Sequence, residues 1–196
     1  SRYDQRGKHR QKNCLHRKAL QKDIFLLVYH FFARKSNLHI VFFIWETMLV
    51  KGGGFMETFC LKTKVISGPG SIAELGRLGC RRVLLVADPY FQKTDVPDRL
   101  MAACGADFAF FYEVQPDPTV ALAAKGTALV QAFQPDTVVA LGGGSAMDCA
   151  KAMVYFSGQT IRFVAIPTTS GSGSEVTDFA ILTHGAVKHP LVDERL

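Results

Sequence analysis

One stretch limits the possible folds of this chain more than any other, residues 137–151, which read Thr-Val-Val-Ala-Leu-Gly-Gly-Gly-Ser-Ala-Met-Asp-Cys-Ala-Lys. Its apolar run, 138–141, is typical of a strand that is buried on both faces of a parallel sheet. The three glycines that follow, the glycine turn 142–144, allow a ligand to approach the backbone closely. Ser145 is predicted as a helix N-cap, with Asp148 at the capping-box position. The stretch therefore predicts a strand, a tight turn and the start of a helix.

This arrangement points to phosphate binding. Backbone N–H groups at a helix start have no partners within the helix, and the helix dipole places partial positive charge there, so a pyrophosphate suits the turn. The alternative is that the glycines form only a flexible turn and that Ser145 and Asp148 are ordinary capping residues, since short glycine motifs also match by chance.

A second stretch favours the phosphate interpretation. Residues 163–177 read Phe-Val-Ala-Ile-Pro-Thr-Thr-Ser-Gly-Ser-Gly-Ser-Glu-Val-Thr, a predicted strand followed by a loop rich in hydroxyl groups and glycine. We call residues 168–174 the hydroxyl loop; its hydroxyl groups belong to Thr168, Thr169, Ser170, Ser172 and Ser174. Two such loops at the ends of neighbouring strands are expected to face one crevice, where ligands bind in open α/β sheets.

The remaining pattern from residue 56 onward alternates predicted strands and helices. Strands are expected at 59–66, 82–87, 108–113 and 178–183, and helices at 96–104 and 119–133, the last with Thr119 as its cap. Ser71 and Glu74 form a capping-box pattern for a short helix that Gly79 closes. Alternation of this kind predicts an α/β fold, a Rossmann-like, mostly parallel sheet with right-handed crossovers.

The two loops together resemble a known family. Residues 142–151 and 166–177 are similar, in order and spacing, to the paired motifs of the iron-containing (group III) alcohol dehydrogenases. The resemblance implies the N-terminal nucleotide-binding domain of the dehydroquinate synthase-like, iron-type alcohol dehydrogenase fold. It further implies an NAD-dependent enzyme that transfers hydride between a primary alcohol or aldehyde and NAD, uses Fe²⁺ or Zn²⁺, and is a homodimer at full length.

Three charged residues match family positions outside the two loops. Asp88, after a predicted strand, can hydrogen-bond the adenosine ribose and disfavour a 2′-phosphate, or can simply be a turn residue before proline. Asp117 stands where the family usually carries Asn, and Lys188 is either a cofactor contact or a solvated strand residue. The cofactor contacts that the resemblance implies are Asp88, Asp117, Gly143, Gly144, Ser145, Asp148, Thr168, Thr169, Ser172, Phe179 and Lys188.

The first 55 residues differ in composition from the rest. They hold eleven of the 23 Lys and Arg residues but only three of the 17 Asp and Glu residues. No recognition motif accompanies this basic segment, so we expect neither nucleic-acid nor membrane partners, and Arg34 and Lys35 interrupt its apolar part before it reaches the roughly 20 residues of a membrane span. A signal peptide fits it poorly. We expect residues 1–55 to be an extension, translated from upstream sequence ahead of Met56, and residues 56–196 to be the dinucleotide-binding domain.

Metal and catalytic residues are not expected in this chain. In the family, an all-helical second domain supplies an Asp and three His to the metal; we recognise no part of it here, so we assign no catalytic residue and no metal ligand and expect little turnover from the isolated polypeptide. The five cysteines are scattered and include no Cys-x-x-Cys pair, which is typical of a cytoplasmic protein. Cys149 is expected to be a small helix residue rather than a nucleophile.

Two other functions stay open. Glycerol dehydrogenases and dehydroquinate synthases share the implied fold and also bind NAD, although the hydroxyl loop favours the iron-type alcohol dehydrogenases. The chain could instead be a non-catalytic nucleotide-binding or interaction module that its basic segment docks to an acidic partner. The substrate cannot be read from these residues, although the strand 161–166 loosely resembles that of short-chain alcohol or propanol dehydrogenases.

Overall fold

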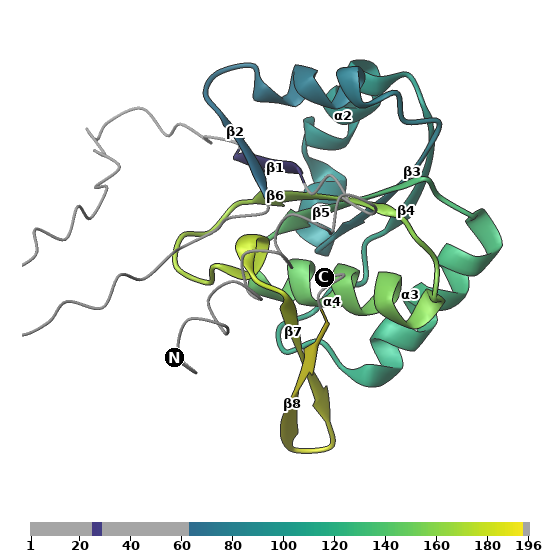
Figure 1. Ribbon diagram of the computed structural model, residues 1–196, viewed down its shortest axis with the longest axis vertical. Helices are drawn as coiled ribbons and strands as arrows, with labels where there is room; N and C mark the ends of the chain where they lie inside the picture. Colours follow the sequence, from purple (N-terminus) through teal and green to yellow (C-terminus); the bar gives the residue numbers. More distant parts are fainter. Residues whose placement is uncertain (1–24, 29–62, 194–196) are drawn as a thin grey trace, which may run out of the picture.

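The computed structural model describes the backbone of residues 25–28 and all of residues 63–193. Within these residues the main feature is a six-stranded sheet in the order β2-β1-β6-β5-β3-β4, with every pairing parallel (Figure 1). Its strands are β1 Phe25–Val28, β2 Lys64–Ser67, β3 Arg82–Ala87, β4 Asp107–Phe111, β5 Thr137–Gly142 and β6 Arg162–Pro167. The predicted α/β fold with a parallel sheet is confirmed.

The three central strands form the core of the sheet because both of their faces are apolar. Strand β5 is buried at all six positions, and Val139 pairs with Leu85 on one side and with Val164 on the other. A strand covered on both faces needs apolar residues at consecutive rather than alternate positions. This explains why the continuous run before the glycine turn folds into the middle of the sheet.

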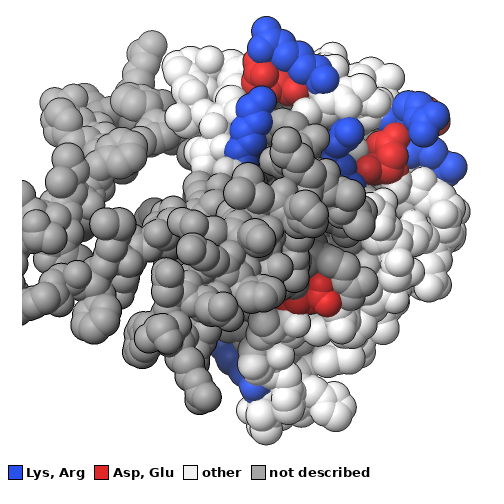
Figure 2. Space-filling view, in the orientation of Figure 1, with Lys and Arg blue, Asp and Glu red and all other residues white. Residues whose placement is uncertain are grey.

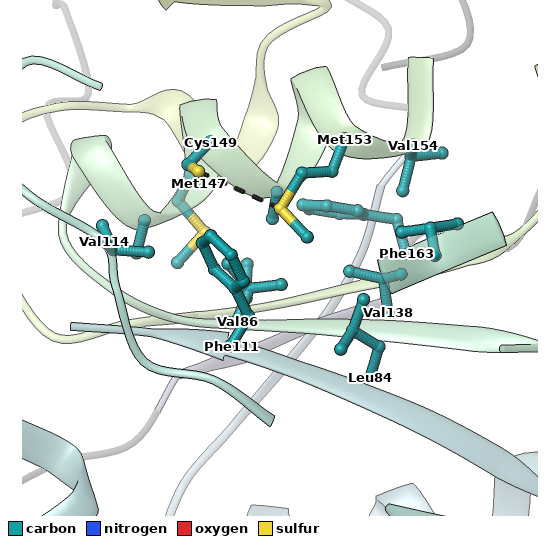
Figure 3. Close-up of a cluster of buried hydrophobic side chains, with 14 of the residues drawn as sticks. Leu84, Val86, Phe111, Val114, Val138, Met147, Cys149, Met153, Val154 and Phe163 are labelled. Carbon is teal, nitrogen blue, oxygen red and sulfur yellow. Dashed lines mark hydrogen bonds between the residues drawn. The ribbon is translucent and has the colours of Figure 1, made fainter. Parts of the chain in front are cut away.

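Helices cover both faces of the sheet (Figure 1). On one face α3 and α4 pack side by side, and their side chains, with those of the sheet, form a buried cluster that includes Leu84, Val138 and Met153 (Figure 3). On the other face η1 and α2 pack over Leu85 and Val139. The bounds are η1 Ser71–Leu78, η2 Pro89–Lys93, α2 Val96–Cys104, α3 Val120–Phe133, α4 Gly144–Ser157 and η3 Ser174–Val176.

Outside the glycine turn, two of the predicted helix-end residues are confirmed and one is wrong. Thr119 caps α3, because its hydroxyl oxygen accepts a hydrogen bond from the Leu122 amide at 3.1 Å, and Gly79 ends η1 in the left-handed conformation. Ser71 is not a cap. Gly70 takes that position with φ 83°, and η1 is a 3₁₀ helix without a side-chain cap, in which Glu74 pairs with Arg77 instead.

Residues 1–55 contribute one strand to the sheet. Strand β1 lies between β2 and β6, with Phe25 opposite both Lys64 and Val164. The rest of the predicted extension, and residues 59–62 of the strand expected at 59–66, lie outside the described residues. The boundary at Met56 and the origin of the extension stay predictions. Among the helices of the described residues, none has the length and apolarity needed to cross a membrane.

A small antiparallel hairpin projects from the α3/α4 side of the domain (Figure 1). It consists of β7 Phe179–His184 and β8 Val187–Val192. Leu182 packs on Ala123 of α3 and Ala152 of α4. The Thr183 amide also donates a hydrogen bond of 2.8 Å to the Pro118 carbonyl, so the hairpin is fastened to the loop that precedes α3.

Candidate nucleotide-binding site

The glycine turn joins the central strand β5 to helix α4. Gly142 has φ 148°, and a Cβ atom at this position would lie 2.8 Å from the Cβ of Ala146, so the turn tolerates only glycine there. Gly143 is the N-cap, because its carbonyl accepts the amides of Ala146 and Met147. The predicted cap at Ser145 is therefore wrong. The turn is tight enough for the helix to begin two residues earlier, so Ser145 lies within its first turn.

The start of α4 presents free backbone donors. The first amides of a helix, here those of Gly144 and Ser145, have no acceptor within the helix. Gly143, Gly144 and Ser145 are half-buried, so these amides lie near the surface rather than deep in the core. Fourteen residues of aligned peptide dipoles stand behind them. This end of α4 is suited to an anionic ligand.

The hydroxyl loop lies directly against the glycine turn. The Thr168 amide donates a hydrogen bond of 2.9 Å to the Gly142 carbonyl. A Cβ atom at Gly143 would lie 2.9 Å from the Thr169 hydroxyl oxygen, and one at Gly144 would lie 3.1 Å from the Ser172 Cβ. The structure thus brings the two loops together, as strands β5 and β6 are neighbours, and glycine at 143 and 144 allows the loops to approach this closely.

A cleft of about 380 Å³ opens beside the glycine turn. Its lining combines strand ends, the turn and the loop after β4, and consists of Asp88, Pro89, Val114, Gln115, Pro116, Gly143, Ser145 and Ala146. Asp88 also caps η2, because its Oδ1 accepts the Tyr90 amide at 2.9 Å. Its Oδ2 lies 3.6 Å from the Cβ position of Gly142. Asp88 therefore caps a turn and also lines the cleft.

Asp148 does not complete a capping box. It lies one turn into α4 with only 8% of its surface exposed, and its Oδ1 has no hydrogen-bond partner. Burial raises the pKa of this carboxyl, and the Ile181 backbone amide, the Ser174 hydroxyl and the charge of Lys151 oppose that rise. Asp148 therefore lies next to Ser174 of the hydroxyl loop and not at the end of the helix.

Lys151, which sequence reasoning left without a role, is also buried, with 2% of its surface exposed. Its Nζ donates to the carbonyl oxygens of Thr177 at 2.6 Å and Phe179 at 3.0 Å, and it lies 3.4 Å from the Thr177 hydroxyl. Burial lowers the pKa of this ammonium to about 8. Phe179, a predicted cofactor residue, begins β7, is half-buried, and meets α4 through this lysine.

Asp117 and Lys188, both predicted cofactor contacts, pair with each other. Their Oδ1 and Nζ atoms are 2.5 Å apart, and both side chains are more than half exposed. Asp117 has φ 53°, a left-handed conformation that Asn and Asp tolerate better than most residues. Neither residue lines the cleft, but Pro116, the neighbour of Asp117, does.

The described part of the chain contains no group of three or more His, Cys, Asp or Glu residues that could hold a metal ion. Cys149 is fully buried on α4, where its sulfur faces Met153 at 3.9 Å (Figure 3), and burial raises its pKa to about 12. A thiol in this state contributes to the packing of the core and does not act as a nucleophile. Basic residues on the face shown in Figure 2 lie beside acidic ones. The ion pairs of the described residues include Arg77–Glu74 and Arg81–Asp136.

Comparisons of the sequence and of the structure with known proteins give matches to alcohol dehydrogenases. Residues 62–196 match the sequence profile of the family described as iron-containing alcohol dehydrogenase. The 1-propanol dehydrogenase PduQ of Salmonella typhimurium is 42% identical over 149 residues, which cover 72% of this chain and 40% of that protein. The iron-containing alcohol dehydrogenase of Thermococcus thioreducens superposes with a TM-score of 0.65 at 29% identity, covering 70% of this chain and 44% of that one.

A second solved structure was determined with a dinucleotide. The sulfoacetaldehyde reductase of Bifidobacterium kashiwanohense, in complex with NAD⁺, superposes with a TM-score of 0.65 at 26% identity. The match covers 72% of this chain and 44% of the reductase. In each of these three comparisons the chain spans less than half of the related protein.

Proposed function

Because the chain belongs to the iron-containing alcohol dehydrogenase family, we propose that the cleft beside β5 binds NAD, with the pyrophosphate at the glycine turn and the first turn of α4, next to the hydroxyl loop. One observation carries the proposal: the cleft of about 380 Å³ is lined by Asp88 and also by Gly143 and Ser145 at the donor end of α4. A pyrophosphate needs donors on more than one side, and the threonine and serine hydroxyls of the opposite loop supply them.

Asp88 gives this site its preference for NAD. Its Oδ1 is held by the Tyr90 amide, which fixes the carboxylate at the cleft and leaves Oδ2 to accept from a ribose hydroxyl. A 2′-phosphate at the same place would bring negative charge against the carboxylate. The solved relative in complex with NAD⁺ is consistent with this assignment.

The proposed reaction of the whole protein is hydride transfer between a small primary alcohol or aldehyde and NAD. NAD, when bound, supplies the hydride acceptor, and the residues described here hold and orient it. Two findings support the substrate class: the family description and the name of the 1-propanol dehydrogenase relative. The described residues offer no metal cluster, so we assign them no metal-dependent step. A homodimer and a cytoplasmic location belong to the same proposal.

The test is calorimetric titration of the full chain with NAD and NADP. We expect saturable binding of NAD by the natural sequence and at least a tenfold loss in Gly144→Val, whose added methyl groups meet Ser172. Asp88→Gly should bind NADP more tightly than the natural sequence does. Ala124→Val, an exposed position on α3, is the matched control and should bind as the natural sequence does. A folded natural chain that does not bind NAD contradicts the proposal.

A further inference from the structure

Lys151 is the most deeply buried charged side chain among the described residues of the site, and the mechanism of binding proposed above does not use it. Its ammonium group donates to the carbonyl oxygens of Thr177 and Phe179, which lie on either side of Asp178 in the chain. The segment from 177 to 179 therefore bends around the end of this one side chain. Removing an ammonium from water is unfavourable unless charge or hydrogen bonds compensate, so its presence here calls for a role.

Charge compensates only in part. Three acidic residues act on Lys151: Asp148 on its own helix, Glu175 in η3, and Asp178 in the bend. All three favour the ammonium form, yet burial outweighs them. Removing the lysine side chain would take away its three hydrogen bonds to one short segment, residues 177–179.

We propose that Lys151 is a positioning residue that fastens residues 174–179 to helix α4 and thereby sets the hydroxyl loop at its distance from the glycine turn. The inference rests on the proposed function, because the hydroxyl loop borders the glycine turn at which the pyrophosphate is proposed to bind. Lys151 belongs to the same helix that presents the free amides. A single rigid helix thus carries the donors at its first turn and the fastening for the opposite wall two turns later.

A short path of contacts connects the lysine to the turn. Lys151 holds the carbonyl of Thr177 at 2.6 Å, and the Thr177 hydroxyl in turn donates to the Ser174 carbonyl at 3.4 Å. Ser174 is buried, and its hydroxyl oxygen lies 3.5 Å from the Cβ position of Gly144. Without the hydrogen bonds from Lys151, residues 177–179 would no longer hold Ser174 and the rest of the hydroxyl loop in place.

The first experiment is amide hydrogen exchange on the full chain without ligand, comparing the natural sequence with Lys151→Met. Methionine keeps most of the length of the side chain and has no donor. We expect protection of residues 174–179 to fall at least tenfold while β5 and β6 keep theirs. Lys125→Met, which removes an exposed lysine of the neighbouring helix α3 that pairs with Glu113 in the loop after β4, is the control and should leave the segment unchanged. Equal protection in both variants overturns the inference.

A second measurement decides the matter if Lys151→Met does not fold. When residues 174–179 open, Lys151 reaches water and its pKa returns toward the usual value, so opening takes up a proton above pH 8. In the natural chain, the protection of this segment, corrected for intrinsic exchange, should rise about tenfold from pH 7.5 to 9.5, by linkage. No rise in the protection of this segment between pH 7.5 and 9.5 would overturn the fastening by Lys151.

NAD affinity separates this inference from the proposed function. If both hold, Lys151→Met weakens NAD binding at least fivefold at a pH where denaturant unfolding shows both proteins fully folded, so that loss of the fold does not account for the weaker binding. If the natural chain binds no NAD but its segment 174–179 depends on Lys151, the proposed function fails and the fastening stands. If NAD binds equally to the natural chain and to Lys151→Met, the positioning role fails and the proposed function stands.

Discussion

The two loops of the site lie against each other, but different interactions hold each of them in place. The glycine turn is shaped by the backbone alone. Gly142 is buried and has a φ of 148°, and a Cβ atom added to it would lie 2.8 Å from the Cβ atom of Ala146. The hydroxyl loop is exposed from Thr168 to Ser172, and the segment that follows it is held by the side chain of Lys151, which donates to the Thr177 carbonyl. One wall of the site is part of the core, and the other is attached to it.

This difference teaches where tolerance to change should lie. A wall built into the core fails when an atom is added, because no neighbour can move away. A wall attached by one side chain fails when that attachment is removed, and its exposed residues can vary with little effect on the fold. The following changes test this contrast, from the largest expected effect to the smallest.

Gly142→Ala should be the most destabilising. It combines a positive φ with a contact of 2.8 Å to a buried Cβ, and strain and overpacking of this kind together cost about 3 kcal/mol or more. Gly171→Ala in the hydroxyl loop is the matched control: its φ is 108°, but nothing lies within 4 Å of the added atom. Denaturant unfolding should give roughly 1–2 kcal/mol there, from strain alone. Equal losses at both positions would break the comparison.

Raising the pH should stabilise the natural chain relative to Lys151→Met. The pKa of Lys151 is lowered to about 8 in the folded chain from 10.5, so between these values the unfolded chain binds more protons and stability rises with pH. The difference in unfolding free energy between the two proteins should move by about 2 kcal/mol in favour of the natural chain from pH 7.5 to 9.5. Cys149 titrates in both proteins and cancels. A constant difference would show that Lys151 is not buried as an ammonium.

Thr169→Ala should affect binding without affecting the fold. Thr169 is exposed, and its hydroxyl faces the Cβ position of Gly143. Loss of one hydrogen bond to a charged phosphate corresponds to about 1.5 kcal/mol, or roughly a tenfold weaker NAD affinity, while the free energy of unfolding should change by less than about 0.5 kcal/mol. Calorimetry and denaturant unfolding measure the two. Substantial unfolding would mean that the hydroxyl loop belongs to the core after all.

Asp117→Asn should give the smallest effect on stability. The pair with Lys188 is exposed on both sides, so its loss should change the unfolding free energy by less than about 1 kcal/mol. Asn also suits the left-handed conformation at φ 53°, so the substitution changes charge alone. Freed from the carboxylate, Lys188 should attract the anionic dinucleotide, and NAD affinity should rise a fewfold at low salt and return to normal at high salt. A rise that salt does not remove would point to a change of shape.

Local patterns predicted much of the fold. The apolar runs at 82–87 and 138–141 became β3 and β5, and the helices expected at 96–104 and 119–133 were found. These succeed because burial on both faces of a strand, or on one face of a helix, is written into consecutive residues. Even the hydroxyl cap at Thr119 could be read directly. The placement of the two loops against each other follows from the adjacency of β5 and β6.

Features set by distant partners were not predictable. The burial of Asp148 depends on Ser174 and Ile181, which come from the segment after β6 and were not connected with it by the sequence pattern. Lys151 is buried because of two carbonyl groups 26 and 28 residues away, and every residue type offers the same carbonyl. Strand β1 belongs to the segment we expected outside the domain, since parallel pairing leaves no short-range mark.

The buried thiol of Cys149 gives the domain a built-in reporter. It is inaccessible in the folded state, and with a pKa of about 12 almost no reactive thiolate forms at neutral pH. Alkylation at this position therefore requires α4 to leave the sheet. The rate at which Cys149 is alkylated would therefore report how often that helix detaches from the sheet. A bound dinucleotide that holds the first turn of α4 should lower this rate.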